Sequence, residues 1–468
     1  MPVPADALFA WHERAGAFQR LSPPWQSVAL VQHEGIREGQ LAKIKMGLGP
    51  LSIRWSARHT DYVAGRQFVD VQEHGPFARW RHTHRMLPDG PDRSVLSDHV
   101  DFALPGGPPA RAIGKGKARR EMARLFAYRH RVTGQDLAAH SRAALAPMRI
   151  AVTGSTGMIG EALVAFLTGG GHRVTRLVRN RSDVLRLSRR PTVRAAFWDP
   201  ATGEIDRAAL DGLDAVIHLA GENVFAPRWT KAKKRRILDS RVDGTTLLAE
   251  TLAGLPNPPK ALLSASASGY YGGRADGVLT EQSPSGTGFL AEVCRAWEAS
   301  TAAAERAGIR TVHLRIGVVL SPSGGLLGVT LPAFKLGLGG WPGDGEQFMP
   351  WVVLDDVLYA IHHALAHDDL SGPLNVSAPE PVRARELFRH LGSVLHRPVP
   401  VRPPAPVLEL VLGEAAREFA LKSVRMKPER LIERGFPFAY PDLDGALRHV
   451  LGRTDRVPAP GSSRPDGA

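Results

Sequence analysis

Apolar and polar residues alternate along the first part of the chain. The alternation covers residues 40–46, 51–62, 67–72, 77–86 and 94–104, and Gly, Pro and Asp separate these runs. A period of two residues is that of a half-buried strand. A helical period follows from about residue 118 to residue 144. Residues 1–147 are therefore predicted to form an α+β domain, in which a curved antiparallel sheet grips a long helix.

The pattern changes at Met148. Short apolar runs at 148–152, 172–178, 215–219, 261–265 and 311–319 alternate with helical stretches. Apolar strands that alternate with helices form a parallel sheet, because each crossover helix covers one face of the sheet. Residues 148–378 are therefore predicted to form an α/β domain with a doubly wound parallel sheet.

The last part of the chain is shorter and mostly helical. A helical period covers residues 385–395, a proline-rich stretch covers 398–406, and two further helical pieces flank Lys427 and Pro428. Residues 379–454 are predicted to form a small helical domain. Residues 455–468 are polar and rich in Pro, Ser and Gly, which is typical of a disordered tail.

The composition is that of a globular protein. The chain has 468 residues, 43% of them hydrophobic and 23% charged, with a net charge of +14. Arginines scattered along all segments account for this charge, and its one dense run lies at residues 231–236, where a solvated helix face is the usual explanation. A negatively charged cofactor or substrate is the second explanation for that run. Without a nucleic-acid-binding motif, we expect no nucleic-acid partner.

The chain has a single cysteine, Cys294, so no intrachain disulfide can form. It has no run of 18 apolar residues, and the N-terminal residues lack the basic and apolar regions of a signal peptide. We therefore expect a cytoplasmic protein that does not enter a membrane.

Three glycines, Gly154, Gly157 and Gly160, lie between a predicted strand and a predicted helix. In a dinucleotide-binding turn the first glycine permits the tight turn, the second lets the pyrophosphate approach the backbone, and the third lets the helix pack on the strand. The free N–H groups of the helix then face the phosphates. This places residues 148–378 in the Rossmann type. The predicted cofactor contacts in the turn are Gly154, Ser155, Thr156, Gly157, Met158 and Ile159.

The end of the next strand indicates which cofactor is bound. A domain that binds NAD(H) places an acidic residue there, but residues 176–181 hold three arginines and the first acid is Asp183. Arginine attracts the 2′-phosphate of NADP(H), whereas an acid repels it. We therefore predict NADP(H) rather than NAD(H), with Arg179 as the contact. The alternative is that Arg179 is an ordinary exposed loop arginine.

These motifs resemble the short-chain dehydrogenase/reductase superfamily in its extended, epimerase-like form. The sequence TGSTGMIG at 153–160, HLAG at 218–221 and SASASGYYG at 264–272 carry the resemblance, and GEN at 221–223, RWT at 228–230 and GDG at 343–345 narrow it to the epimerase family branch. Members of this branch end in a small helical domain. The resemblance implies further cofactor contacts at Leu219, Ala220, Gly221 and Glu222.

The first domain resembles another family. Trp11-His12, LSPPW at 21–25 and WRHTH at 80–84 are similar to the START/polyketide-cyclase-like helix-grip domains. This resemblance implies a cavity for an apolar ligand in residues 1–147.

The catalytic pattern of the superfamily is incomplete. Its active members use Tyr-x-x-x-Lys on a helix, and aligned on Glu298 those two positions hold Leu290 and Cys294, which cannot replace them. Ser266 on the fifth strand and Tyr271 remain as catalytic candidates. Two functions follow: an NADP(H)-binding oxidoreductase or epimerase acting on an unknown small substrate, or an inactive NADP(H)-binding sensor or scaffold with an apolar-ligand domain.

His82 and His84 lie two residues apart on a predicted strand and so share one face of it. A pair of histidines on one face can bind a metal ion. Acidic partners are scarce nearby in the sequence, so we expect satisfied histidines that line a cavity or the surface, and no metal.

Overall fold

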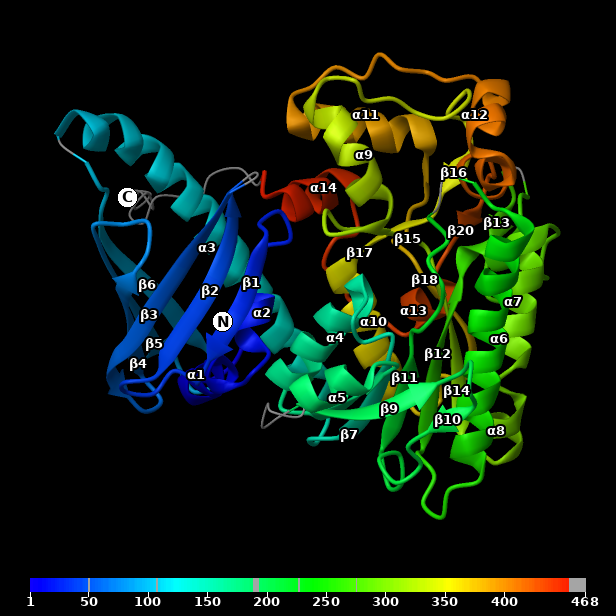
Figure 1. Ribbon diagram of the computed structural model, residues 1–468, viewed down its shortest axis with the longest axis horizontal. Coiled ribbons are helices and arrows are strands. Elements are labelled where there is room, and N and C mark those ends of the chain that lie inside the picture. Colours follow the sequence, from blue (N-terminus) through cyan, green and yellow to red (C-terminus); the bar gives the residue numbers. More distant parts are fainter. Residues whose placement is uncertain (49–50, 107, 188–192, 226–227, 275, 454–468) are drawn as a thin grey trace, which may run out of the picture. The chain divides into compact units, whose positions relative to one another are not determined.

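The computed structural model describes residues 1–48, 51–106, 108–187, 193–225, 228–274 and 276–453 (Figure 1). These residues form two compact units. The first unit consists of Met1–Glu13, Phe18–Leu137 and the described residues from Leu447 onward, and the second consists of Arg14–Ala17 and Ala138–Ala446. The predicted tail, residues 455–468, lies outside the described residues.

The predicted boundaries at 147 and 378 differ from those of the two units. Residues 138–147 belong to the second unit, and so do residues 379–446. Short strands explain why residues 379–446 belong to the second unit. Strand β19 (Val382–Arg383) pairs with β16 (Phe348–Met349), and β20 (Arg425–Met426) pairs with β13 (Val278–Leu279). The C-terminal segment therefore shares its backbone hydrogen bonds with the second unit.

The first unit contains a six-stranded antiparallel sheet in which every strand pairs with the next one along the chain. Five of the six strands were predicted. The sixth, β1, was missed, because its side chains are half-exposed and its register shifts between Leu30 and Gln32. The strands are β1 Val28–His33, β2 Leu41–Leu48, β3 Leu51–Val63, β4 Gln67–His74, β5 Arg79–Pro88 and β6 Ser94–Ala103.

Among the described residues, three helices accompany this sheet: α1 (Ala5–Glu13), the short α2 (Ala17–Arg20) and the long α3 (Pro108–Ala143). Alternate residues of β5 are buried, from Trp80 to Met86. The ring of Phe126 on α3 lies 5.0 Å from that of His82, so the helix packs on this buried face. The predicted α+β fold is therefore confirmed.

His82 and His84 do have acidic partners, which corrects the prediction that such partners are scarce. The antiparallel register places Asp70 of β4 opposite His82, and Asp98 of β6 opposite His84. Residues directly opposite each other share one face of the sheet. The partners were missed because they are distant in sequence and adjacent only through strand pairing.

The last turn of helix α14 (Leu443–Leu451) belongs to the first unit. Arg124 on α3 donates hydrogen bonds of 2.6 Å to the carbonyl oxygens of Leu451 and Gly452, and the rings of Tyr128 and His449 stack. A cation that bonds these terminal carbonyls satisfies acceptors that no helical N–H can reach and complements the helix dipole.

The second unit is built on an eight-stranded sheet with the order β10-β9-β8-β7-β11-β12-β14-β18. All neighbours are parallel except the edge pair β9–β10. Counted from β7, the central order is 3-2-1-4-5-6, the Rossmann order, so the predicted fold class is confirmed. The strands are β7 Arg149–Thr153, β8 Arg173–Val178, β9 Val193–Asp199, β10 Glu204–Ile205, β11 Ala215–His218, β12 Ala261–Ala267, β14 Arg310–Ile316 and β18 Gly372–Val376.

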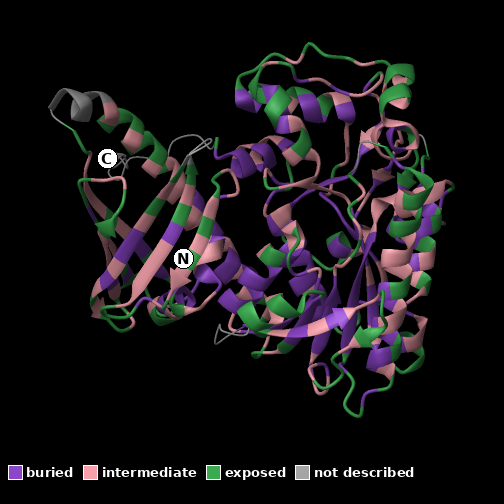
Figure 2. Ribbon diagram, viewed as in Figure 1, coloured by how far each residue is buried: buried purple, intermediate pink, exposed green. Residues whose placement is uncertain are grey.

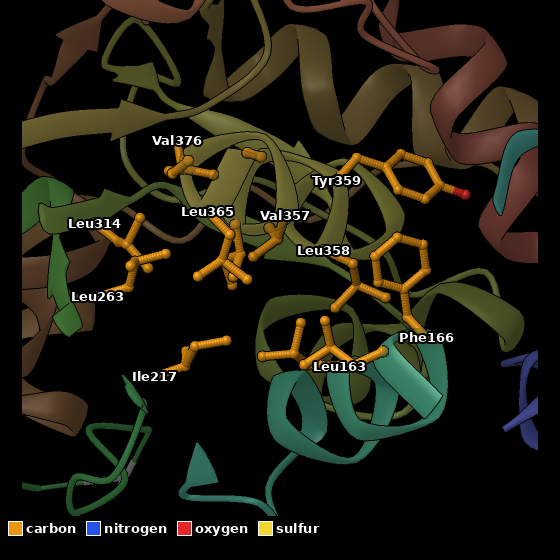
Figure 3. Close-up of a cluster of buried hydrophobic side chains, with 14 of the residues drawn as sticks. Leu163, Phe166, Ile217, Leu263, Leu314, Val357, Leu358, Tyr359, Leu365 and Val376 are labelled. Atoms are coloured by element: carbon orange, nitrogen blue, oxygen red, sulfur yellow. The ribbon is translucent and has the colours of Figure 1, made fainter. Parts of the chain in front are cut away.

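Helices cover both faces of this sheet, and its central strands are almost wholly buried (Figure 2). On one face, Leu163 and Phe166 of α4 and Leu358 of α10 pack with apolar residues of the strands (Figure 3). On the other face, Leu248 and Leu252 of α6 do the same. The helices around the sheet are α4 Met158–Gly169, α5 Arg181–Leu187, α6 Lys231–Ala253, α7 Phe289–Ala299, α8 Ala302–Arg306 and α10 Leu354–Ala366.

Shorter elements extend this core. The predicted strand 311–319 divides at Gly317 into β14 and β15 (Val318–Leu320), and β15 pairs with β17 (Trp351–Val353). The others are the single turn Ser268–Tyr271, α9 Gly325–Lys335, α11 Ala384–Leu395, α12 Ala405–Leu412, the turn Ala416–Ala420 and α13 Glu429–Glu433. Within the described part of the chain, no helix is long and apolar enough to cross a membrane.

Candidate dinucleotide and substrate site

The glycine turn lies between β7 and α4, where the strand order of the sheet reverses. Gly154 has a φ of +63°, and a Cβ there would lie 2.7 Å from the carbonyl carbon and oxygen of Leu219. A Cβ on Gly160 would lie 2.2 Å from the Gly154 oxygen, whereas one on Gly157 would meet that oxygen at 3.3 Å. Gly154 and Gly160 are therefore required by the turn itself. Gly157, which is exposed, leaves room for a ligand beside the first turn of α4.

A buried chain of side chains holds the turn in place. Thr153 Oγ1 accepts hydrogen bonds from the backbone N–H groups of Leu219 and Ala220, and lies 2.7 Å from Nδ1 of His218. The hydroxyl of Thr153 therefore donates a hydrogen bond to Nδ1 of His218, and Nε2 of His218 donates one to Thr245 at 2.9 Å. Burial lowers the pKa of His218 to about 3, so this imidazole stays neutral. The carboxyl ends of β7 and β11 are fixed together by this chain.

The turn forms one wall of a cavity of about 520 Å³. Residues of helix α7 and of the carboxyl end of β12 also line it. A cavity of this volume is typical of ligand sites. Of the residues predicted for the site, Gly154, Gly157, Met158, Ile159, Leu219, Gly221, Glu222 and Ser266 line it.

Four other predicted cofactor residues do not line the cavity. Ser155 is buried beneath the turn, where its carbonyl oxygen accepts a hydrogen bond from Arg176. Thr156 is exposed, and the backbone N–H of Ala220 is bonded to Thr153. Arg179 is exposed just beyond the carboxyl end of β8, at the edge of the sheet where the turn also lies.

Ser266 lines the cavity and is also hydrogen-bonded to a buried ion pair. Its hydroxyl donates to Oε1 of Glu298 at 2.7 Å, and Arg315 donates to both oxygens of Glu298 at 2.9 Å. Ser266 of β12 and Arg315 of β14 are paired in register, which places both side chains on one side of the sheet. Glu298 and Arg315 were not predicted as site residues, because the pairing of β12 with β14 and the packing of α7 bring them to Ser266 from distant parts of the sequence.

Tyr271 lies beside the cavity without lining it. Its hydroxyl donates to Oδ1 of Asn375 at 2.6 Å and accepts from Arg315 at 3.0 Å. Burial raises the pKa of Tyr271 to about 12. This hydroxyl, the second catalytic candidate, therefore holds Arg315 in place, and the geometry gives no support to direct contact with a substrate.

The two positions that carry Tyr and Lys in active relatives both line the cavity. Leu290 and Cys294 lie one turn apart on α7, as the sequence indicates. Burial raises the pKa of the Cys294 thiol to about 11, so it remains protonated at neutral pH. Neither residue provides a positive charge or an acidic hydroxyl.

The basic run at the start of α6 is partly engaged in ion pairs, contrary to its interpretation as a solvated face. Nζ of Lys233 lies 2.7 Å from the carboxylate of Glu222, and Nζ of Lys234 lies 2.8 Å from Glu414. The hydrogen bond from Lys233 lowers the pKa of Glu222. The carboxylate of Glu222, which lines the cavity, is therefore paired with a cation of this run.

Comparisons with known proteins agree with this geometry. Residues 150–377 match the NAD dependent epimerase/dehydratase family, residues 1–126 match the polyketide cyclase/dehydrase and lipid transport family, and residues 403–450 match a domain of unknown function. An epimerase family protein of Mycobacterium tuberculosis is 39% identical over 65% of this chain and 98% of its own length.

Two solved structures are also similar. A nucleoside-diphosphate sugar epimerase from Corynebacterium glutamicum has 33% identity and a TM-score of 0.78, over 97% of this chain and 89% of its own. The human epimerase family protein SDR39U1, solved with NADPH, has 32% identity and a TM-score of 0.58, over 65% of this chain and 99% of its own. Both resemblances drawn from the motifs are confirmed, and the chain belongs to the epimerase family, with a polyketide-cyclase-like domain before its Rossmann domain.

Proposed function

We propose that the second unit binds NADP(H) and acts as an oxidoreductase or epimerase on a small substrate held beside Ser266. The observation that carries this proposal is that the glycine turn and Ser266 line one cavity of about 520 Å³. A cofactor held by the turn would therefore share a space with a substrate that contacts Ser266.

The residues present fit the dinucleotide. Gly157 leaves open the space where the pyrophosphate approaches the first turn of α4, and Arg179 is exposed where the adenosine 2′-phosphate would lie. The human relative solved with NADPH supports this choice of cofactor. When bound, the nicotinamide would supply or accept a hydride.

The chain itself would handle the proton. Ser266 would hold the substrate oxygen, and Glu298, already 2.7 Å from the serine hydroxyl, would take up or return the proton through it. Arg315 would keep Glu298 in position with its two hydrogen bonds. This arrangement would replace the missing Tyr and Lys.

A second candidate function is a sensor or scaffold that binds NADP(H) without turnover. The observation in its favour is the pair Leu290 and Cys294, which brings an apolar side chain and a protonated thiol to the wall where a proton donor is needed. The N-terminal domain would then bind the apolar ligand that its family resemblance implies.

Cofactor titration tests the binding part of the proposal. We expect the full chain to bind NADPH several-fold more tightly than NADH. The fluorescence of the cofactor measures both affinities. Arg179→Asp should weaken NADPH about 30-fold, or ~2 kcal/mol, with little effect on NADH. Arg173→Asp, at the exposed amino end of the same strand, is the control. Equal affinities for both cofactors in the parent protein would contradict the assignment.

Turnover separates the two candidate functions. The test measures NADPH consumption, and epimer formation by chromatography, with a panel of nucleoside diphosphate sugars and small carbonyl compounds. An enzyme should turn over at least one of them, and Ser266→Ala should lower kcat about 100-fold while leaving NADPH affinity unchanged. Tight NADPH binding without turnover of the whole panel would favour the sensor.

A further inference from the structure

The buried face of the N-terminal sheet carries a cluster of histidines and carboxylates that the proposed function does not use. Asp70, His82 and His84 each offer one ligand atom, and these atoms lie within 4.8 Å of one another. Asp98 lies behind the two histidines, on the next strand. All four residues belong to the first unit.

We propose that Asp70, His82 and His84 form a binding site for one divalent transition-metal ion of the Zn²⁺ type. Oδ2 of Asp70 lies 3.1 Å from Nε2 of His84 and 3.5 Å from Nδ1 of His82. Ligands bound at about 2.1 Å around one ion lie about 3.0–3.4 Å from each other in octahedral or tetrahedral geometry. The spacing of these atoms therefore matches that of a coordination shell.

Asp98 orients the two histidines from the far side. Its Oδ1 lies 2.9 Å from Nε2 of His82 and 2.8 Å from Nδ1 of His84, so it faces the nitrogens that point away from Asp70. Metal-binding histidines commonly donate their second N–H to a carboxylate, which fixes the tautomer and strengthens the ligand. Asp98 would thus be a positioning residue that orients the two histidine ligands.

Unsatisfied polar atoms provide an independent observation. Oδ1 of Asp70 and Nδ1 of His59 lie 2.7 Å apart, yet both are buried and neither has a hydrogen bond of acceptable geometry. Buried polar atoms are normally satisfied, so these two exceptions indicate a missing partner. A cation bound by the carboxylate of Asp70 would be a partner for its Oδ1.

Charge and access also favour a cation here. Two carboxylates, Asp70 and Asp98, face the cluster, and the half-buried Arg129 supplies one positive charge against them. The Asp70 side chain is 21% exposed, whereas those of His82 and His84 are buried, so the ion would be reached from the side of Asp70. Two histidines and one carboxylate also leave a coordination position open for water, as in catalytic zinc sites.

A second cluster, His140, His172 and His362 in the other unit, has ligand atoms equally close together but not the same surroundings. Arg14 adds its positive charge there and disfavours a cation. We therefore place the metal in the N-terminal unit alone.

The test uses the full chain, freed of metal with a chelator and titrated with Zn²⁺ by calorimetry and with Co²⁺ by visible absorption. We expect one ion per chain and a Co²⁺ spectrum of nitrogen and oxygen ligands. His84→Asn should lower Zn²⁺ affinity at least 100-fold, and Asp98→Asn 10- to 100-fold. The control is His99→Asn, an exposed histidine on the same strand as Asp98.

Tryptophan fluorescence, through Trp80 beside the cluster, checks that each variant keeps its fold. Stoichiometric Zn²⁺ binding that is lost in His84→Asn, weakened in Asp98→Asn and kept in His99→Asn would support the site. The proposal fails if the parent chain binds no Zn²⁺, if folded His84→Asn and Asp98→Asn bind it as tightly as the parent, or if His99→Asn loses it too.

Discussion

The two units bury histidines in opposite electrostatic surroundings. In the first unit burial opposes the charged form of His84, but the carboxylates of Asp98 and Asp70 raise its pKa to about 9. In the second unit the ring of His362 packs on those of Phe166 and His172, and burial lowers the pKa values of His172 and His362 to about 4 and about 3. With no metal ion bound, the same side chain is thus charged in one core and neutral in the other, and a metal ion that binds His84 would displace its proton.

This difference shows that neighbouring strands, rather than burial alone, decide the charge of a core histidine. The register of the antiparallel sheet brings Asp70 and Asp98 to the histidines of the first unit. In the second unit no carboxylate takes this place at His172 or His362: the N–H of Met148 bonds Nδ1 of His172, and Nε2 of His362 has no hydrogen-bond partner among the described residues. A core whose histidines are paired with carboxylates therefore keeps its stability under moderate acidification, whereas a core with neutral buried histidines loses stability.

The largest expected effect is acid destabilisation of the second unit. A histidine whose pKa is lower in the folded than in the unfolded chain stabilises the fold fully above the unfolded value of about 6.5, and loses this as pH falls. Between pH 7 and pH 5, we expect each of His172 and His362 to cost about 2 kcal/mol of unfolding free energy. The unfolding free energy of each unit can be measured by urea unfolding at the two pH values, with proteolytic fragments of each unit quantified to follow its unfolding.

The variant His362→Leu sharpens this test. It should lose about 2 kcal/mol less than the parent between pH 7 and pH 5, whatever its stability at pH 7. The exposed His99→Leu should keep the parent's pH slope. A second unit equally stable at both pH values would break the comparison.

The next effect comes from removing a buried carboxylate in the first unit. Asp98→Asn should destabilise that unit by about 3 kcal/mol, because His82 and His84 would lose the partner that compensates their burial. Cofactor binding by the second unit should not change. Asp101→Asn on the same strand is the control, since its pair with Arg79 is exposed and should contribute less than about 0.5 kcal/mol. Thermal unfolding of the metal-free chain compares the two variants. Equal destabilisation by Asp98→Asn and Asp101→Asn would show that burial does not strengthen the pairs of Asp98.

The smallest effect concerns His130, which reaches the same carboxylate from α3. Its side chain is 40% exposed, so water screens the pair with Asp98. We expect His130→Gln to destabilise the first unit by less than about 1 kcal/mol in the same thermal assay. A loss as large as that of Asp98→Asn would show that exposure does not set the strength of these pairs.

The sequence predicts those parts of the molecule that depend on local patterns. The alternation of apolar residues identifies five strands of the first sheet, and the spacing of Gly154, Gly157 and Gly160 identifies the turn, because each feature lies within a few consecutive residues. The strands β9 and β18 were missed, since neither was separable from the loops and helices around it.

Features that depend on strand pairing were not predictable in the same way. Arg315 lies beside Ser266 because β12 and β14 are neighbours in register, and Glu298 reaches both residues from α7. Asp70 and Asp98 face the histidines for the same reason. Counting inward from the turns between β4, β5 and β6 would have given this register, since each successive strand returns beside the last.

The cap that Arg124 places on the end of α14 has a consequence for the order of folding during synthesis. A chain made from its N-terminus presents the first sheet and most of α3 to the solvent long before Leu447 and His449 leave the ribosome. Until then Tyr128 lacks the ring that stacks on it, and the guanidinium of Arg124 lacks its two carbonyl partners. The nascent N-terminal domain is therefore incomplete until the last helix is made, and a chain that ends before residue 447 lacks one of the two rings that pack on Tyr128 and both carbonyl partners of Arg124.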